Sequence, residues 1–292
     1  MKIASRSLEP LPATTYSAQR AWSEFWADPA QSQCAAAAPA IWQALTRHWS
    51  TFARSLAPGT RVLDIGCGAG IVGRLLLVAR PDLRVTGIDS AMVPTSAQAN
   101  LELLSGVAME STPFPPQSFG AVVSQFAYEY GDTDATAREL ARVVRPGARL
   151  SFLAHHSGSA ILADNGARTT AFAAFLSQGT RAAFCAGDLP AFEARMRGLL
   201  AAYPDGLFVE LSRRLPRQMA GDPARRAAVW QAIEDALAPE QCVLESLSAR
   251  RVEPAQLAEW SAPLRKLCNL EPIVALSEAD GTPVAWKLDG IC

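Results

Sequence analysis

The chain has 292 residues, of which 49% are hydrophobic and 19% are charged. A globular protein of this length and composition can bury a sizeable core as one enlarged domain. The formal net charge is −1, so neither nucleic acid nor an anionic membrane is an electrostatically obvious partner.

The cysteines and the N-terminal residues bear on the cellular compartment. Six cysteines are scattered along the chain, with no Cys-x-x-Cys pair and no histidine at metal-ligand spacing. We therefore expect free thiols and no metal site. Residues 1–6 lack the apolar core of a signal peptide, and no uncharged apolar run reaches a membrane-spanning length. These features predict a cytoplasmic protein without a membrane partner.

Residues 1–57 are predicted to form an N-terminal helical cap. An Ala-rich helical stretch is broken near Pro39 and continues over residues 41–56. Tyr16, Trp22 and Trp26 precede it, and these aromatic side chains either close over a bound ligand as walls or pack in the core.

Residues 62–70 read Val-Leu-Asp-Ile-Gly-Cys-Gly-Ala-Gly, an apolar strand that runs into a glycine-rich turn. A helical pattern follows over residues 71–79. The glycines allow positive φ angles and leave no side chains to hold a ligand away from the backbone. The free amides at the start of the helix suit an anionic group such as a carboxylate or a phosphate.

The second strand is predicted over residues 83–88 and ends in Asp89. The spacing from Gly70 is 89 − 70 = 19 residues, close to the spacing of about 20 at which such folds place an acid on a ribose. The alternative is a strand-to-helix turn without a ligand, followed by an ordinary aspartate at a strand end.

Strands and helices continue to alternate up to residue 156. We predict a third strand over residues 106–109, a fourth over 121–125 and a fifth over 149–154, with a helix capped near Asp132 or Thr133 before the fifth. This alternation predicts a parallel sheet covered by helices on both faces, and it defines a core domain over residues 58–156.

The rest of the chain divides into two parts. Residues 157–265 are mostly helical and exceed what the core needs, so we expect an insert that forms a lid over a small acceptor or a surface for a homodimer. Residues 266–292 contain two apolar runs around Asp280-Gly281, which predict a hairpin that completes the sheet.

Several motifs in the core resemble one family, the class I S-adenosylmethionine-dependent methyltransferases, and in particular the group similar to quinone-biosynthesis C-methyltransferases. The motifs are residues 64–70, 110–119 and 139–147. The resemblance implies an α/β, Rossmann-like methyltransferase fold with a mostly parallel seven-stranded sheet. It also implies S-adenosyl-L-methionine as the cofactor and S-adenosyl-L-homocysteine as its product.

The resemblance and the strand ends together assign cofactor-binding residues. The glycine turn would lie against the methionine part and Asp89 on the ribose. Ala108 and Gly120 stand where many members carry aspartate, so adenine recognition rests on the backbone at Met109 and on Glu110. The assigned residues are Asp64, Gly66, Cys67, Gly68, Gly70, Asp89, Ser90, Met109, Glu110, Ser124 and Gln125.

Methyl transfer from a sulfonium needs the acceptor held near attack distance and, for oxygen or nitrogen acceptors, deprotonated. A base would lie after strand four or strand five. Tyr128 and Glu129 follow the fourth strand, and His155 and His156 follow the fifth, so these four are the catalytic candidates. Packing and capping are the alternatives for each of them.

The sequence therefore predicts methyl transfer to the oxygen, nitrogen or carbon atom of a small molecule, in specialised-metabolite or quinone-like biosynthesis. One alternative is an enzyme of the same fold that uses the cofactor without methyl transfer. Another is a non-catalytic, cofactor-binding partner protein. Nucleic-acid substrates are not expected, because no basic stripe is present. The basic residues include 24 arginines (27 − 3 lysines), which suggests a GC-rich bacterial source.

Overall fold

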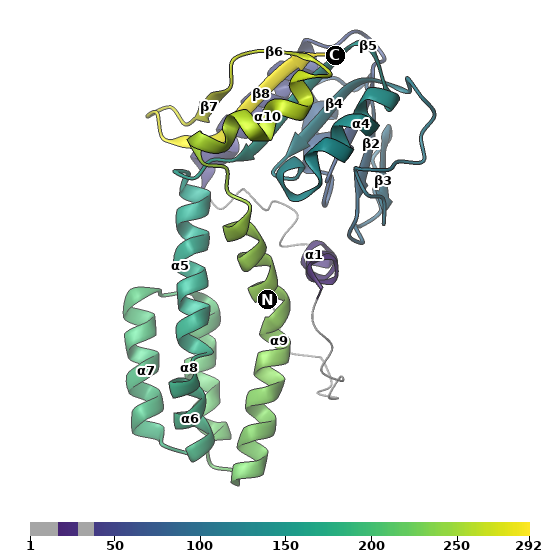
Figure 1. The fold of residues 1–292 in the computed structure, drawn as a ribbon. Coiled ribbons are helices and arrows are strands. Elements are labelled where there is room, and N and C mark those ends of the chain that lie inside the picture. The colour runs from purple at the N-terminus through teal and green to yellow at the C-terminus, as the bar shows by residue number, and fades with distance from the viewer. Residues whose placement is uncertain (1–16, 29–37) are drawn as a thin grey trace. The chain divides into compact units, whose positions relative to one another are not determined.

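The structure is a computed structural model that describes residues 17–28 and 38–292. The described residues separate into two compact units (Figure 1). Of the described residues, 22–28, 38–163 and 247–292 form the sheet unit, and residues 17–21 and 164–246 form the helical unit. The N-terminal cap is described only in part, and Tyr16 lies outside the described residues.

The sheet unit is built on one mixed sheet of eight strands among the described residues, in the order β3-β2-β1-β4-β5-β8-β6, with β7 pairing β8. The strands are β1 (Arg61–Ile65), β2 (Arg84–Asp89), β3 (Leu101–Ser105), β4 (Phe119–Gln125), β5 (Val144–His155), β6 (Asn269–Leu270), β7 (Val274–Ser277) and β8 (Pro283–Ile291).

The first five strands run parallel, and β8 pairs antiparallel with β5. This arrangement confirms the predicted α/β, Rossmann-like sheet and the C-terminal hairpin, which is formed by β7 and β8. The sheet has one strand more than the expected seven, since the two-residue strand β6 also pairs with β8.

Helices cover both faces of the sheet because successive strand residues point to opposite sides. On one face, α2 (Pro39–Arg54) and α3 (Ile71–Ala79) pack on Val62, Val85 and Val123. On the other face, α4 (Thr133–Val143) and α10 (Leu257–Arg265) pack on alternating residues such as Leu63 and Phe152. Helix α10 therefore belongs to the sheet unit and not to the helical insert, which the sequence had extended to residue 265.

The third strand differs from the prediction. The sequence placed it at residues 106–109, whereas β3 spans Leu101–Ser105 and pairs with β2. Gly106 has a φ of +72°, which ends the strand, and the amide of Val107 instead donates to the carbonyl of Asp89. The fifth strand is also longer than predicted, because the Pro146-Gly147 turn lies within an irregular stretch of β5.

A disulfide corrects the expectation that the cysteines are free thiols. Cys268, after α10, is bonded to Cys292 beside the β5–β8 pair, and 24 residues separate them in sequence. Their spacing gave no signal, because the proximity arises only when β8 returns along the sheet. Cys67, Cys185 and Cys242 are free.

The helical unit has its own aromatic core. Ser177, Asp188 and Asp205 cap its helices by accepting backbone N–H donors. Phe175, Phe184, Phe192, Phe208 and Trp230 are buried together. The helices of this part of the chain are α5 (Ala160–Phe175), α6 (Gln178–Ala186), α7 (Leu189–Ala202), α8 (Gly206–Gln218) and α9 (Pro223–Ala249). Among the described helices, none is both long and apolar enough to cross a membrane.

Candidate functional site

The turn between β1 and α3 confirms the need for glycine. Gly66, Gly68 and Gly70 have φ angles of +65°, +49° and +78°. A Cβ on Gly66 would lie 2.1 Å from the Cβ of Ala127, and one on Gly68 would lie 2.5 Å from the indole of Trp26. Backbone conformation and close packing therefore both exclude side chains from this turn.

Asp89 lies at the end of β2 with its carboxylate turned toward the glycine turn. Its two oxygens accept hydrogen bonds from the amides of Gly68 and Ala91, each at 2.9 Å. Burial raises the pKa of Asp89, and these two amide donors oppose that rise. Each oxygen retains a lone pair, so the carboxylate can still accept hydrogen bonds from a ligand.

Asp64 is fully buried at the carboxyl end of β1. Neither of its carboxylate oxygens has a hydrogen-bond partner among the described side chains and backbone groups. Burial, followed by the nearby charge of Asp89, raises the pKa of Asp64 from 3.8 to about 8, and the backbone amide of Gly73, which lies near the carboxyl group, opposes part of this rise. A buried polar group without partners is costly, which makes this carboxyl group a candidate for contact with a positively charged ligand group.

We predict that Asp64 makes the unliganded protein less stable as the pH rises. Between pH 4 and pH 8 the folded state keeps a proton on Asp64 that the unfolded chain has lost, so stability falls through this window. The variant Asp64→Asn removes this penalty. The quantity to compare is the free energy of unfolding of the variant minus that of the wild type. This difference should be about 1–3 kcal/mol larger at pH 8 than at pH 4. Urea titrations at both pH values measure the difference, and a constant difference would contradict the prediction.

A second polar group lies where β4 and β5 end. Glu129, in the short 3₁₀ helix η2 (Tyr128–Tyr130), accepts hydrogen bonds at its Oε1 from the backbone amide of His155 at 2.9 Å and from the Nδ1 of His155 at 2.8 Å. Both side chains are only 3% exposed. The pairing fixes the tautomer of His155, since its Nδ1 must carry the proton to donate to Glu129.

Phe126 connects this pair to the end of β4. It has a φ of +58°, an uncommon angle for a residue other than glycine, and its ring stacks on the His155 ring at 4.4 Å. The next residue, Ala127, is the one that packs against Gly66. The glycine turn and the Glu129–His155 pair are therefore neighbours at one edge of the sheet.

The aromatic residues of α1 (Ala18–Ala27) lie along the same edge. Trp26 lies against Gly68, and Trp22 stacks on Trp26 at 5.8 Å and meets the ring of Tyr130 at 5.9 Å. The hydroxyl of Ser23 accepts a hydrogen bond from the amide of Met92. Trp22 and Trp26 therefore pack beside the glycine turn and Tyr130, and their role as walls over a bound ligand stays a prediction.

The structure brings some of the other predicted residues to this edge and assigns structural contacts to the rest. Ser124 is buried and ties β1 to η2, since its Oγ donates to Ile65 and accepts from the amide of Tyr128. Met109 and Glu110 lie against Gly131, where a Cβ would meet the Met109 sulfur at 3.0 Å. Cys67 is a buried thiol, and Ser90 is exposed.

Three predicted residues point away from the Glu129–His155 pair. The buried ring of Tyr128 packs on Phe152 and Trp260, and its hydroxyl donates to Thr133. His156 lies against Trp286 at 4.0 Å and accepts at Nδ1 from Gly158. The Oε1 of Gln125 accepts a hydrogen bond from Trp49 of α2.

Sequence reasoning missed Phe126 and Ala127. Both follow the fourth strand directly, which is where parallel sheets bind ligands, so their position was the available signal. Neither residue carries a titratable group, in contrast to the neighbouring Tyr128 and Glu129.

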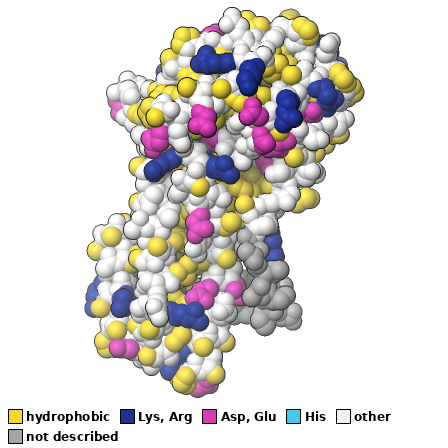
Figure 2. All heavy atoms as spheres, in the orientation of Figure 1, with side chains coloured by type: hydrophobic (Ala, Val, Ile, Leu, Met, Phe, Trp, Pro, Cys, Tyr) yellow, Lys and Arg dark blue, Asp and Glu magenta, His cyan; other side chains and the backbone are white. Residues whose placement is uncertain are grey.

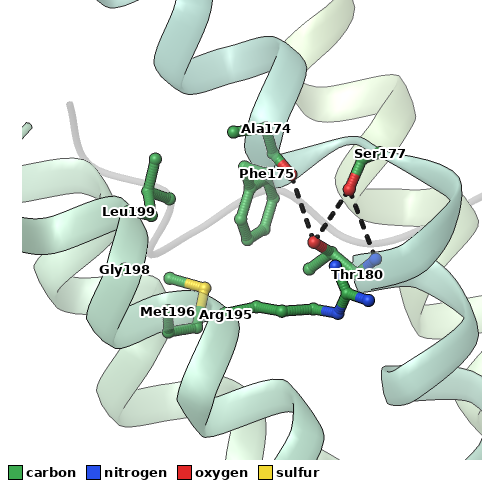
Figure 3. Close-up of a pocket in the computed structure, with 8 residues that line it drawn as sticks. All are labelled: Ala174, Phe175, Ser177, Thr180, Arg195, Met196, Gly198 and Leu199. Atoms are coloured by element: carbon green, nitrogen blue, oxygen red, sulfur yellow. Dashed lines mark hydrogen bonds between the residues drawn. The ribbon is translucent and has the colours of Figure 1, made fainter. Parts of the chain in front are cut away.

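The helical unit contains a separate cavity of about 290 Å³. Figure 3 shows Phe175 and Leu199 beside it, with the side chain of Arg195 extended along one side. The hydroxyl of Thr180 donates to the carbonyl of Ala174 and pairs with Ser177. None of the residues that line it was predicted to act in binding or catalysis.

Residues 63–152 match the family described as "Methyltransferase domain". The chain is 34% identical over 97 residues to a demethylmenaquinone methyltransferase of Corynebacterium kroppenstedtii, a match that covers 32% of this chain and 41% of the relative. It is 35% identical over 108 residues to a ubiquinone biosynthesis O-methyltransferase of Hahella chejuensis, covering 34% of this chain and 44% of the relative. The matches thus span less than half the length of these curated relatives.

Among solved structures, the chain is similar to a SAM-dependent methyltransferase from Aquifex aeolicus. The TM-score is 0.44 and the identity 11%, over 95% of this chain and 99% of that one.

Proposed function

Because residues 63–152 are a class I methyltransferase domain, whose cofactor is S-adenosylmethionine, we propose that this protein catalyses methyl transfer from that cofactor to a small-molecule acceptor. The observation that carries the proposal is the glycine turn with Asp89 hydrogen-bonded to Gly68. S-adenosylmethionine supplies an electrophilic methyl group when bound. The protein's part is to hold the acceptor in line and, where needed, to remove its proton.

The residues at the turn fit this cofactor. Asp89 keeps lone pairs for the two hydroxyls of a ribose, and the positive φ angles of Gly66 and Gly68 shape the turn that would lie against the methionine part. The unpartnered carboxyl of Asp64 suits the ammonium group of the methionine part. Met109 and Glu110, beside Gly131, are the proposed adenine contacts.

For the acceptor we propose a quinone-like or specialised metabolite, and the names of the two curated relatives support this class. On the visible face in Figure 2, the described Lys and Arg side chains are interspersed with Asp and Glu, which does not favour a nucleic-acid substrate. The protein would act in the cytoplasm, and the helical unit would form a homodimer surface. Product mass distinguishes methyl transfer from non-methylating chemistry of the same cofactor.

The test is calorimetric titration with S-adenosylmethionine and S-adenosylhomocysteine. We expect both to bind, and we expect Asp89→Ala to weaken binding at least tenfold, which corresponds to about 1.4 kcal/mol. Glu102→Ala, which removes an exposed carboxylate on β3, is the matched control and should bind like the wild type. A denaturant midpoint recorded for each variant separates lost contacts from lost folding. If neither compound binds the wild type, the proposal fails and a non-catalytic member of the fold becomes the better description.

A further inference from the structure

The Glu129–His155 pair has two unused hydrogen-bonding atoms. Glu129 accepts both hydrogen bonds from His155 at Oε1, while its buried Oε2 has no partner among the described residues. Among the described residues, none forms a hydrogen bond with the Nε2 of His155. This nitrogen is the acceptor in the tautomer that Glu129 imposes. If the pair only stabilised the end of β5, a buried carboxylate hydrogen-bonded to the imidazole would not be needed.

The surroundings of His155 are aromatic and carry little other charge. Phe126 stacks on one face of its ring, and Tyr130 meets it edge-on at 6.1 Å. Trp22 in turn lies at right angles to Tyr130. The titratable groups that face His155 are Glu129 and Tyr130, both from η2, while the neighbouring His156 faces Trp286. Aromatic side chains of this kind bind flat, apolar molecules.

We propose that His155 is the general base of the reaction, that Glu129 positions it, and that the acceptor is an aromatic hydroxyl compound. The inference rests on the proposed function. In the step, the acceptor oxygen forms its bond to the methyl carbon as the methyl–sulfur bond breaks, and the sulfur keeps that electron pair. The hydroxyl proton passes to Nε2 of His155, and the carboxylate of Glu129 stabilises the imidazolium that results.

The chemistry of the pair selects this acceptor class. A carboxylic acid is already ionised at neutral pH, so its methylation would need no base. A phenolic hydroxyl is mostly protonated at neutral pH, with a pKa near 10 for tyrosine, and gains most from a histidine base. Its ring also matches the aromatic surfaces of Phe126, Tyr130 and Trp22.

The first experiment uses 4-nitrophenol, whose phenolate is detected by its visible absorbance, with the protein saturated with S-adenosylhomocysteine. We expect the bound probe to ionise at least one pH unit lower than the free probe, because the proton moves to His155. In His155→Ala this shift should disappear. Glu129→Gln keeps the size and the hydrogen-bond acceptor but removes the charge. At a fixed pH, the fraction of bound probe present as phenolate should be at least threefold lower in this variant than in the wild type.

His156→Ala is the matched control, since it removes the adjacent histidine from a different environment, and it should keep the full shift. A probe that does not bind, or that ionises equally in wild type and His155→Ala, would overturn the proposal. An unchanged shift in Glu129→Gln would overturn the positioning role of Glu129. Calorimetry with S-adenosylhomocysteine on the same samples distinguishes failure of this inference from failure of the proposed function. Cofactor binding that persists with a negative probe result would contradict only the role of His155.

Discussion

Replacing Gly66 with alanine is expected to abolish measurable cofactor binding and to destabilise the sheet unit by about 2–4 kcal/mol, the sum of overpacking and a left-handed backbone angle. The new Cβ would lie 2.1 Å from the Cβ of Ala127, a distance that neither backbone can accommodate without moving. The glycine turn and the segment after β4 would move apart. This displacement affects both the proposed cofactor site at the turn and the proposed acceptor site at the Glu129–His155 pair. Urea denaturation and calorimetry with S-adenosylmethionine measure the two effects.

Two further variants separate the causes. Gly106→Ala also places alanine at a positive φ, +72°, but no atom lies within 4 Å of the added Cβ, so it should cost only the backbone strain of about 1–2 kcal/mol and leave cofactor binding intact. The double variant Gly66→Ala/Ala127→Gly removes the opposing Cβ and should recover part of the binding. Equal behaviour of Gly66→Ala and Gly106→Ala would show that the contact with Ala127 is unimportant.

The elements that local pattern determines were predicted well. The apolar run before Gly66 and the helix over residues 71–79 agree with β1 and α3, and Asp132 caps α4 through the amide of Ala135. The third strand was misplaced because residues 101–105 are only partly buried at the edge of the sheet and carry no alternation. Edge strands depend on pairing with a neighbour, which a local pattern does not report.

The sequence indicated which residues could lie in the candidate site, but not which of them form hydrogen bonds with one another. Asp89, Glu129 and His155 were each predicted to follow a strand, and parallel strands end at one edge of the sheet. The choice of His155 over His156, and of Glu129 over Tyr128, depends on which way each side chain points after its strand ends. The hydrogen bond between Glu129 and His155 joins residues 26 positions apart, and the disulfide between Cys268 and Cys292 likewise needs the complete sheet.

Replacing Trp230 with alanine is expected to destabilise the helical unit by about 3–5 kcal/mol, because it removes the largest buried side chain of that core. Trp230 stacks on Phe175 at 5.5 Å, contacts Phe184 at 5.4 Å and donates from Nε1 to Glu234. The buried residues of this core all lie between residues 171 and 244, and none comes from the sheet. We therefore expect the helices to melt in a separate, earlier transition.

Circular dichroism during heating, with and without S-adenosylhomocysteine, tests this expectation. In Trp230→Ala the first transition should move to lower temperature and should not respond to the ligand, whereas the second should keep both its midpoint and its stabilisation by the ligand. Leu189→Ala, at a position 38% exposed in the same unit, is the control and should change stability by less than about 0.5 kcal/mol. A single transition that shifts as a whole would mean that the helical unit and the sheet unit unfold together, which would contradict the prediction.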